Sequence, residues 1–180
     1  MKIAVYCSSR RALDQECYEL AQELGQWLGA QGHTLVYGGV NAGLMHAVAQ
    51  ACHDAGGHIV GVNIEAFKHR TDPLVDEVIY TADLGERKAR MYDLADAFVV
   101  LPGGLGTVDE WIATLSQLVV NGDERRKVFV LNWRGMYDSL LHYLDEMARS
   151  PFARDRHMDV TVVVNSVQQL TDKINQCNEK

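Results

Sequence analysis

"DAFVVLPGGLGTVDEW", residues 96–111, contains the pattern that decides the fold: an apolar run, a glycine-rich turn, and then a segment with helical periodicity. The run at 96–102 is typical of a strand that is buried on both faces of a parallel sheet. Three of the next four residues are glycines, which a chain tolerates where something must approach the backbone closely. Residues 107–121 then predict a helix, so the glycines lie between the end of a strand and the start of a helix.

The same alternation continues along most of the chain. Strands are predicted at 2–7, 58–64, 76–82, 127–133 and 160–164, and residues 34–39 predict a strand that runs into a turn. Further helices are predicted at 14–31, 42–55, 84–95, 136–148 and 166–177. Residues 65–75, which include charges and a proline, are predicted to be a loop. Regular strand–helix alternation predicts an α/β fold, a doubly wound parallel sheet with helices on both faces. No composition shift divides the chain, so residues 1–180 are expected to form a single domain.

Composition restricts the class of partner and the compartment. The formal net charge is −7, which argues against a nucleic-acid partner because such a partner needs a basic face. The first apolar run is too short for a signal peptide or a membrane span. Four cysteines are scattered without a C-x-x-C pair, which favours reduced thiols in a cytoplasmic protein. No metal-ligand spacing stands out, and no metal is expected.

Three turns follow predicted strands: "CSSRR" (7–11), "GGVNAG" (38–43) and "PGGLGT" (102–107). Ligands of doubly wound sheets bind beyond the carboxyl ends of the strands, so these turns are expected to meet at one crevice. The glycines at 103, 104 and 106 leave backbone N–H groups uncovered before a helix, which favours a phosphate site. The alternative is that all three are ordinary tight turns. Neither the P-loop pattern nor the dinucleotide fingerprint is present, so NAD is not supported.

Two charged positions have both a structural and a catalytic interpretation. Glu110 follows Thr107 by three residues, which is the spacing of a helix capping box. Arg87 belongs to "ERKARM" (86–91), which has the periodicity of a solvated helical face. A cation opposite a carboxylate beside a phosphate site would instead be a catalytic arrangement, and periodicity alone leaves both interpretations open.

"RKARM" (87–91) and "PGGLGTVDE" (102–110) together match the paired signature R-K-x-x-M and P-G-G-x-G-T-x-x-E. Over nearly its whole length the chain resembles the LONELY GUY (LOG) family, cytokinin riboside 5′-monophosphate phosphoribohydrolases whose members often carry the label possible lysine decarboxylase. The resemblance implies a Rossmann-like homodimer, without metal or cofactor, that hydrolyses the N-glycosidic bond of a nucleoside 5′-monophosphate. It implies that Arg87 and Glu110 are catalytic. The implied substrate-binding residues are Ser9, Gly38, Gly39, Lys88, Gly103, Gly104, Gly106 and Thr107.

The chain departs from the family pattern at several turns. Val40 and His46 replace glycines of the G-G-G-N-x-G-L-M-G turn, Leu84-Gly85-Glu86 precedes Arg87, and Asn63-Ile64 stands where G-V-I-P is usual. These departures leave open whether the base is adenine, an isoprenylated adenine or another purine. The main rival function is a molybdenum-cofactor carrier, which shares this kind of fold and holds a phosphate-bearing ligand without cleaving it. A lysine decarboxylase is not supported, because no lysine lies in a recognisable pyridoxal phosphate site.

Overall fold

The computed structural model describes residues 1–151 and 157–178 and has one seven-stranded sheet in the order β4-β3-β2-β1-β5-β6-β7. Every neighbouring pair of strands is parallel. The strands are β1 (Lys2–Tyr6), β2 (Thr34–Tyr37), β3 (His58–Ile64), β4 (Glu77–Thr81), β5 (Ala97–Val100), β6 (Val128–Leu131) and β7 (Thr161–Val164). The helices are α1 (Gln15–Ala30), α2 (Gly43–Asp54), α3 (Leu84–Leu94), α4 (Leu105–Asn121), α5 (Asp138–Ala148) and α6 (Val167–Asn178). The predicted α/β fold is confirmed.

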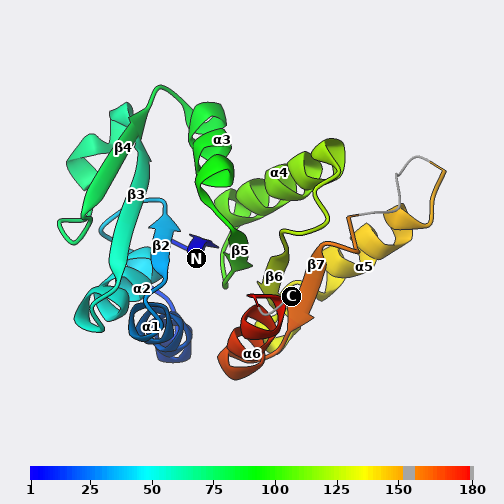
Figure 1. Cartoon of the computed structure of the whole chain (residues 1–180), viewed down its shortest axis with the longest axis horizontal. Helices are drawn as coiled ribbons and strands as arrows, with labels where there is room; N and C mark the ends of the chain where they lie inside the picture. Colours follow the sequence, from blue (N-terminus) through cyan, green and yellow to red (C-terminus); the bar gives the residue numbers. More distant parts are fainter. Residues whose placement is uncertain (152–156, 179–180) are drawn as a thin grey trace.

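Helices cover both faces of the sheet because alternate residues of each strand point to opposite sides. On one face, Ile3 and Val5 of β1 pack with apolar side chains of α1, α2 and α6. On the other, Ala4 and Tyr6 pack with those of α3, α4 and α5. Figure 1 shows α3 and α4 above the sheet and α1, α2 and α6 below it. This burial on both sides explains why β5 reads as a continuous apolar run, all four of whose residues are buried.

The order in which the chain adds strands to the sheet reverses at β1. From β1 the chain builds outward through β2 and β3 to β4, and then returns so that β5 pairs with the free side of β1. The loops that leave β1 and β5 therefore turn toward opposite faces and leave a crevice between them. Such a switch point is where open α/β sheets bind their ligands.

The structure corrects the prediction for residues 65–75. They are not a plain loop, because Glu65–Arg70 form a 3-10 helix, η1, directly after β3. The side chain of Asn63 starts this turn: its Oδ1 accepts a hydrogen bond from the Ile64 N–H, and its Nδ2 donates to the Phe67 carbonyl. Side-chain hydrogen bonds of this kind offer the backbone a local alternative that apolar periodicity does not reveal.

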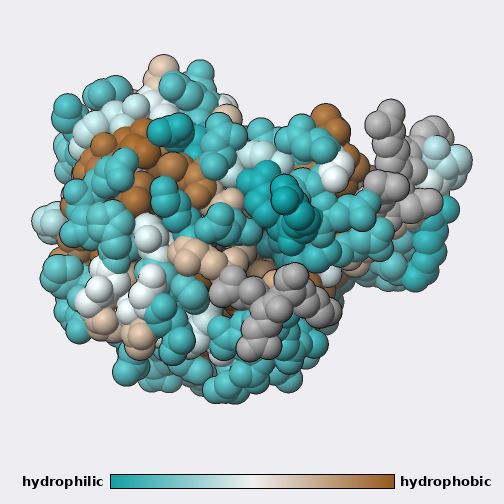
Figure 2. Space-filling model, in the orientation of Figure 1, coloured by the Kyte–Doolittle hydropathy of each residue, from teal (hydrophilic) through white to brown (hydrophobic). Residues whose placement is uncertain are grey.

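The apolar side chains of α4 are covered in the middle of the helix and exposed near its ends. Trp111, Leu115 and Leu118 are buried against the sheet, whereas Leu105 and Val120, near the two ends of the helix, are 86% and 74% exposed. Other exposed hydrophobic side chains include Val78 on the edge strand β4 and Leu84 at the start of α3. Figure 2 shows hydrophobic residues gathered on the surface around β4.

Candidate active site

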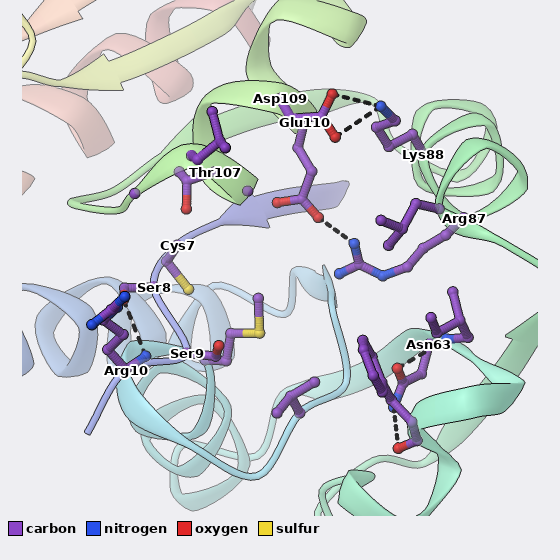
Figure 3. Close-up of a pocket in the computed structure, with 18 of the residues that line it drawn as sticks. Cys7, Ser8, Ser9, Arg10, Asn63, Arg87, Lys88, Thr107, Asp109 and Glu110 are labelled. Carbon is purple, nitrogen blue, oxygen red and sulfur yellow. Dashed lines mark hydrogen bonds and ion pairs between the residues drawn. The ribbon is translucent and has the colours of Figure 1, made fainter.

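A pocket of about 400 Å³ opens at the carboxyl ends of the strands, at the switch point beside β1. The turns after β1, β2 and β5 all contribute to its lining, which confirms that the three turns meet at one crevice. The segment after β3 and the first residues of α3 complete the wall. Figure 3 shows side chains from these segments facing one another across the pocket.

Arg87 and Glu110 form an ion pair inside this pocket. Arg87 Nη1 donates to Glu110 Oε1 at 2.6 Å, and the two residues are only 8% and 5% exposed. Arg87 Nε donates to the Val62 carbonyl at 2.8 Å, so the guanidinium is held at two points. A Cβ built at Gly38 would overlap the third guanidinium nitrogen, Nη2. Arg87 is therefore fixed between β3, the Gly38 turn and Glu110, and it orients the carboxylate.

The capping-box interpretation of Glu110 is wrong. Gly104, not Thr107, is the N-cap of α4, and the Val108 N–H donates to the Gly104 carbonyl. Glu110 thus lies in the second helical turn, where its side chain reaches Arg87 rather than the free N–H groups of the helix start. A comparable cap occurs on α3 instead, where Asp83 accepts from the Glu86 N–H and Glu86 accepts from the Ala82 N–H.

Two features of the surroundings of Glu110, its burial and its contact with Arg87, change its pKa in opposite directions. Burial raises the pKa of Glu110 above the ordinary glutamate value, because removing a carboxylate from water disfavours its charged form. Arg87 acts in the opposite direction through its charge and its hydrogen bond. A shielded carboxylate aimed at a pocket by an arginine is a group that can stabilise positive charge or accept a proton.

The glycine-rich turn leads into the amino end of α4. Gly104, Gly106 and Thr107 line the pocket, and the first N–H groups of the helix have no partner within it. Gly103 does not line the pocket, but a Cβ there would overlap the Thr107 hydroxyl, so a side chain would disturb the turn. An amide-rich helix start of this kind attracts an anion.

The remaining predicted residues divide into lining and supporting ones. Ser9 lines the pocket directly. Lys88 also lines it, and its Nζ donates to both carboxylate oxygens of Asp109 at 2.7 and 2.8 Å. Gly39 does not line it: Gly39 has a left-handed φ of 66° and packs against Gly61 of β3.

Sequence reasoning missed two arginines at the pocket, Arg10 and Arg70. Neither pairs with a carboxylate among the described residues, whereas Arg87 and Lys88 do. The lining thus has four cationic side chains and two carboxylates, a formal charge of +2 in a chain whose net charge is −7. Arg10 stood in the quoted turn "CSSRR", so its place after a strand was the available signal.

Within residues 1–151 and 157–178, no three histidine, cysteine or acidic side chains are grouped so that they could hold a metal ion. In the same part of the chain, no helix combines the length and the apolar character that a membrane crossing requires.

Comparison with known proteins identifies the family. The family described as "Possible lysine decarboxylase" matches residues 45–174. The chain is 33% identical to the cytokinin riboside 5′-monophosphate phosphoribohydrolase LOG3 of Arabidopsis thaliana, over 99% of this chain and 85% of that protein. It is 34% identical to the LOG phosphoribohydrolase of Oryza sativa subsp. japonica, over 96% of this chain and 72% of that protein. The chain belongs to the LOG family.

Solved structures with the same fold include proteins whose names describe a function other than that of the LOG enzymes. A molybdenum cofactor binding protein from Rippkaea orientalis superposes with a TM-score of 0.77 at 21% identity, over 97% of this chain and 95% of that one. The molybdenum cofactor carrier protein of Chlamydomonas reinhardtii gives 0.77 at 22% identity, over 99% and 98%. At these identities the likeness concerns the fold alone, whereas the matches to LOG proteins concern the sequence itself.

Proposed function

We propose that this LOG-family chain hydrolyses the N-glycosidic bond of a purine nucleoside 5′-monophosphate, with cytokinin ribotides among its substrates. Its products are the free base and ribose 5-phosphate. The observation that carries the proposal is the buried Arg87–Glu110 pair, which faces a pocket that begins at an amide-rich helix start. The names of the relatives, which are cytokinin riboside 5′-monophosphate phosphoribohydrolases, support the same reaction.

In this proposal Glu110 is the catalytic residue. As the bond from C1′ to the base nitrogen breaks, its electron pair leaves with the base, and the sugar acquires oxocarbenium character. The Glu110 carboxylate stabilises that charge and accepts a proton from the water that adds to C1′. The departing base takes up a proton, so one water is consumed for each bond broken. Arg87 keeps the carboxylate in place and does not give up a proton itself.

The 5′-phosphate binds at the start of α4. Gly104, Gly106 and Thr107 offer backbone N–H groups there, and Ser9 lies across the pocket. Lys88 belongs to the substrate-binding set as well, on the rim that it shares with Asp109. The formal charge of +2 on the lining suits a phosphate dianion. Binding energy from this remote phosphate orients the sugar for the chemical step.

A carrier of a phosphate-bearing cofactor is the second candidate, and the fold shared with molybdenum cofactor carriers favours it. A carrier has no need of an arginine and a glutamate buried together at the ligand pocket. Such a pair is costly to desolvate, and its presence at the pocket favours a chemical role over simple binding.

The test is a product assay with AMP, isopentenyl-AMP and the matching nucleosides. We expect base release from the monophosphates and far slower release from the nucleosides, because the nucleosides lack the phosphate that the α4 turn binds. Equal rates for AMP and adenosine would contradict the phosphate site. Binding without any base release from either monophosphate would favour the carrier.

We also propose that the chain acts as a homodimer in the cytoplasm. The family resemblance and the exposed hydrophobic residues around β4 support the dimer, since such a surface favours a partner. Light scattering should give twice the mass of the 20.1 kDa chain. A monomer mass at micromolar concentration would refute the dimer.

A further inference from the structure

A nucleoside monophosphate has its phosphate at one end, its sugar in the middle and its base at the other end, and groups suited to each part follow one another along the pocket. Figure 3 shows Thr107, Ser8 and Arg10 on one side of Glu110, and Arg87 and Asn63 on the other. If the phosphate binds at the start of α4 and C1′ faces Glu110, the base extends toward Asn63 at the end of β3. The lining on that side includes Ile64, Phe67 and Arg70, two of which belong to η1.

This side of the pocket is built as a fixed segment. Asn63 is 1% exposed, and its Nδ2 donates to the Phe67 carbonyl at 3.3 Å and to Thr71 Oγ1 at 3.2 Å. Thr71 also lies 3.2 Å from the Tyr80 hydroxyl of β4. The Asn41 N–H donates to the Arg70 carbonyl at 2.9 Å, which ties the far end of η1 to the turn after β2. A segment held at both ends can present its side chains in one position.

Two side chains of η1, Phe67 and Arg70, line the pocket. Phe67 is 40% exposed. Arg70 pairs with no carboxylate among the described residues, and its guanidinium carbon lies 5.6 Å from the centre of the Phe67 ring. An exposed aromatic ring beside a cation without a carboxylate partner suits a planar, nitrogen-rich ring, which stacks on the first and accepts hydrogen bonds from the second.

Arg87 is not available to donate hydrogen bonds to the ring nitrogens of the base. Its Nε and Nη1 are bound to the Val62 carbonyl and to Glu110, and its Nη2 packs against Gly38. The acceptor nitrogens of the base must therefore find a donor elsewhere, and Arg70 is a cation on the base side that has none of these commitments. We propose that η1 is the base-recognition element of this chain, with Phe67 stacking on the purine and Arg70 donating to its ring nitrogens. This inference rests on the proposed function and names the residues that bind the base of the proposed substrate.

The experiment separates recognition of the base from recognition of the phosphate. The affinity for AMP and for ribose 5-phosphate, which has no base, is measured by calorimetry for the wild type, Phe67→Ala, Phe67→Tyr and Arg70→Ala. Tyr143→Ala and Arg90→Ala are matched controls, because Tyr143 and Arg90 are exposed and do not line the pocket. Where AMP is cleaved, KM and the inhibition constant of ribose 5-phosphate are measured as well.

We expect Phe67→Ala to weaken AMP binding roughly 5- to 150-fold, the range that stacking of one base on an aromatic ring supplies. Ribose 5-phosphate should bind as in the wild type, and Phe67→Tyr should retain AMP affinity because it keeps the ring. Arg70→Ala should also weaken AMP selectively. Equal losses for AMP and ribose 5-phosphate, or no loss for either, would overturn the inference. A wild type that binds AMP without cleaving it would refute the hydrolase and still allow this comparison.

Discussion

Replacing Glu110 with glutamine tests the centre of the proposed mechanism with the least change of shape. Glutamine keeps an oxygen where Oε1 accepts from Arg87, but it has no charge to stabilise an oxocarbenium ion and no basicity toward water. Turnover of AMP should therefore fall about 10²–10⁴-fold, the usual contribution of a positioned acid–base group. The Michaelis constant should change far less, because the lost interaction belongs mainly to the transition state.

The structure also sets the cost in stability. The pair is buried, so Glu110→Gln leaves the Arg87 guanidinium without its counter-charge, which costs about 3–5 kcal/mol. A loss of that size lowers the melting temperature of a domain of this length by roughly 6–20 °C. A capping role, which the sequence spacing suggested, would have left melting almost unchanged. The two expectations are separated by one calorimetric scan.

Glu86→Gln is the matched control for both measurements. Glu86 accepts a hydrogen bond from the Ala82 N–H at the start of α3 and does not line the pocket. Its glutamine variant should melt and turn over almost as the wild type does. If Glu110→Gln keeps more than about a tenth of wild-type turnover, where a general base would account for 10²-fold or more, the catalytic assignment is refuted.

Three further perturbations address the same site. Arg87→Lys keeps the charge but loses the planar guanidinium, which donates to both Glu110 and the Val62 carbonyl, and we expect turnover to fall about 10²-fold. Wild-type turnover in this variant would show that the guanidinium geometry is unimportant. Gly38→Ala places a methyl group against Arg87 and Met45, which should cost about 1–3 kcal/mol in a denaturation measurement and displace the guanidinium; unchanged melting and turnover would contradict this packing. The value of kcat/KM should fall at acid pH, with a midpoint above the ordinary glutamate pKa, because burial raises the pKa of Glu110 and protonation removes its charge. A midpoint at or below the ordinary glutamate pKa would argue for another base.

The sequence by itself determined the fold class and the family. A buried parallel strand such as β5 is a continuous run of apolar residues. In a helix such as α4, apolar residues recur every three to four positions. Both patterns lie within short stretches of the chain, so the sequence alone predicts these elements. The paired motifs around Arg87 and Glu110 likewise depend only on short spacings. The place of the site followed as well, because the carboxyl ends of parallel strands share one edge.

Only the tertiary structure decided what individual side chains do there. Thr107 and Glu110 have the spacing of a cap, yet the helix begins at Gly104, and the carboxylate meets an arginine 23 residues away in the chain. Phe67 and Arg70 fell in a segment without periodicity, and Asn63 holds that segment through hydrogen bonds that no apolar pattern records. A partner is chosen by distance and by the cost of leaving a buried polar group unpaired, and both are properties of the folded chain.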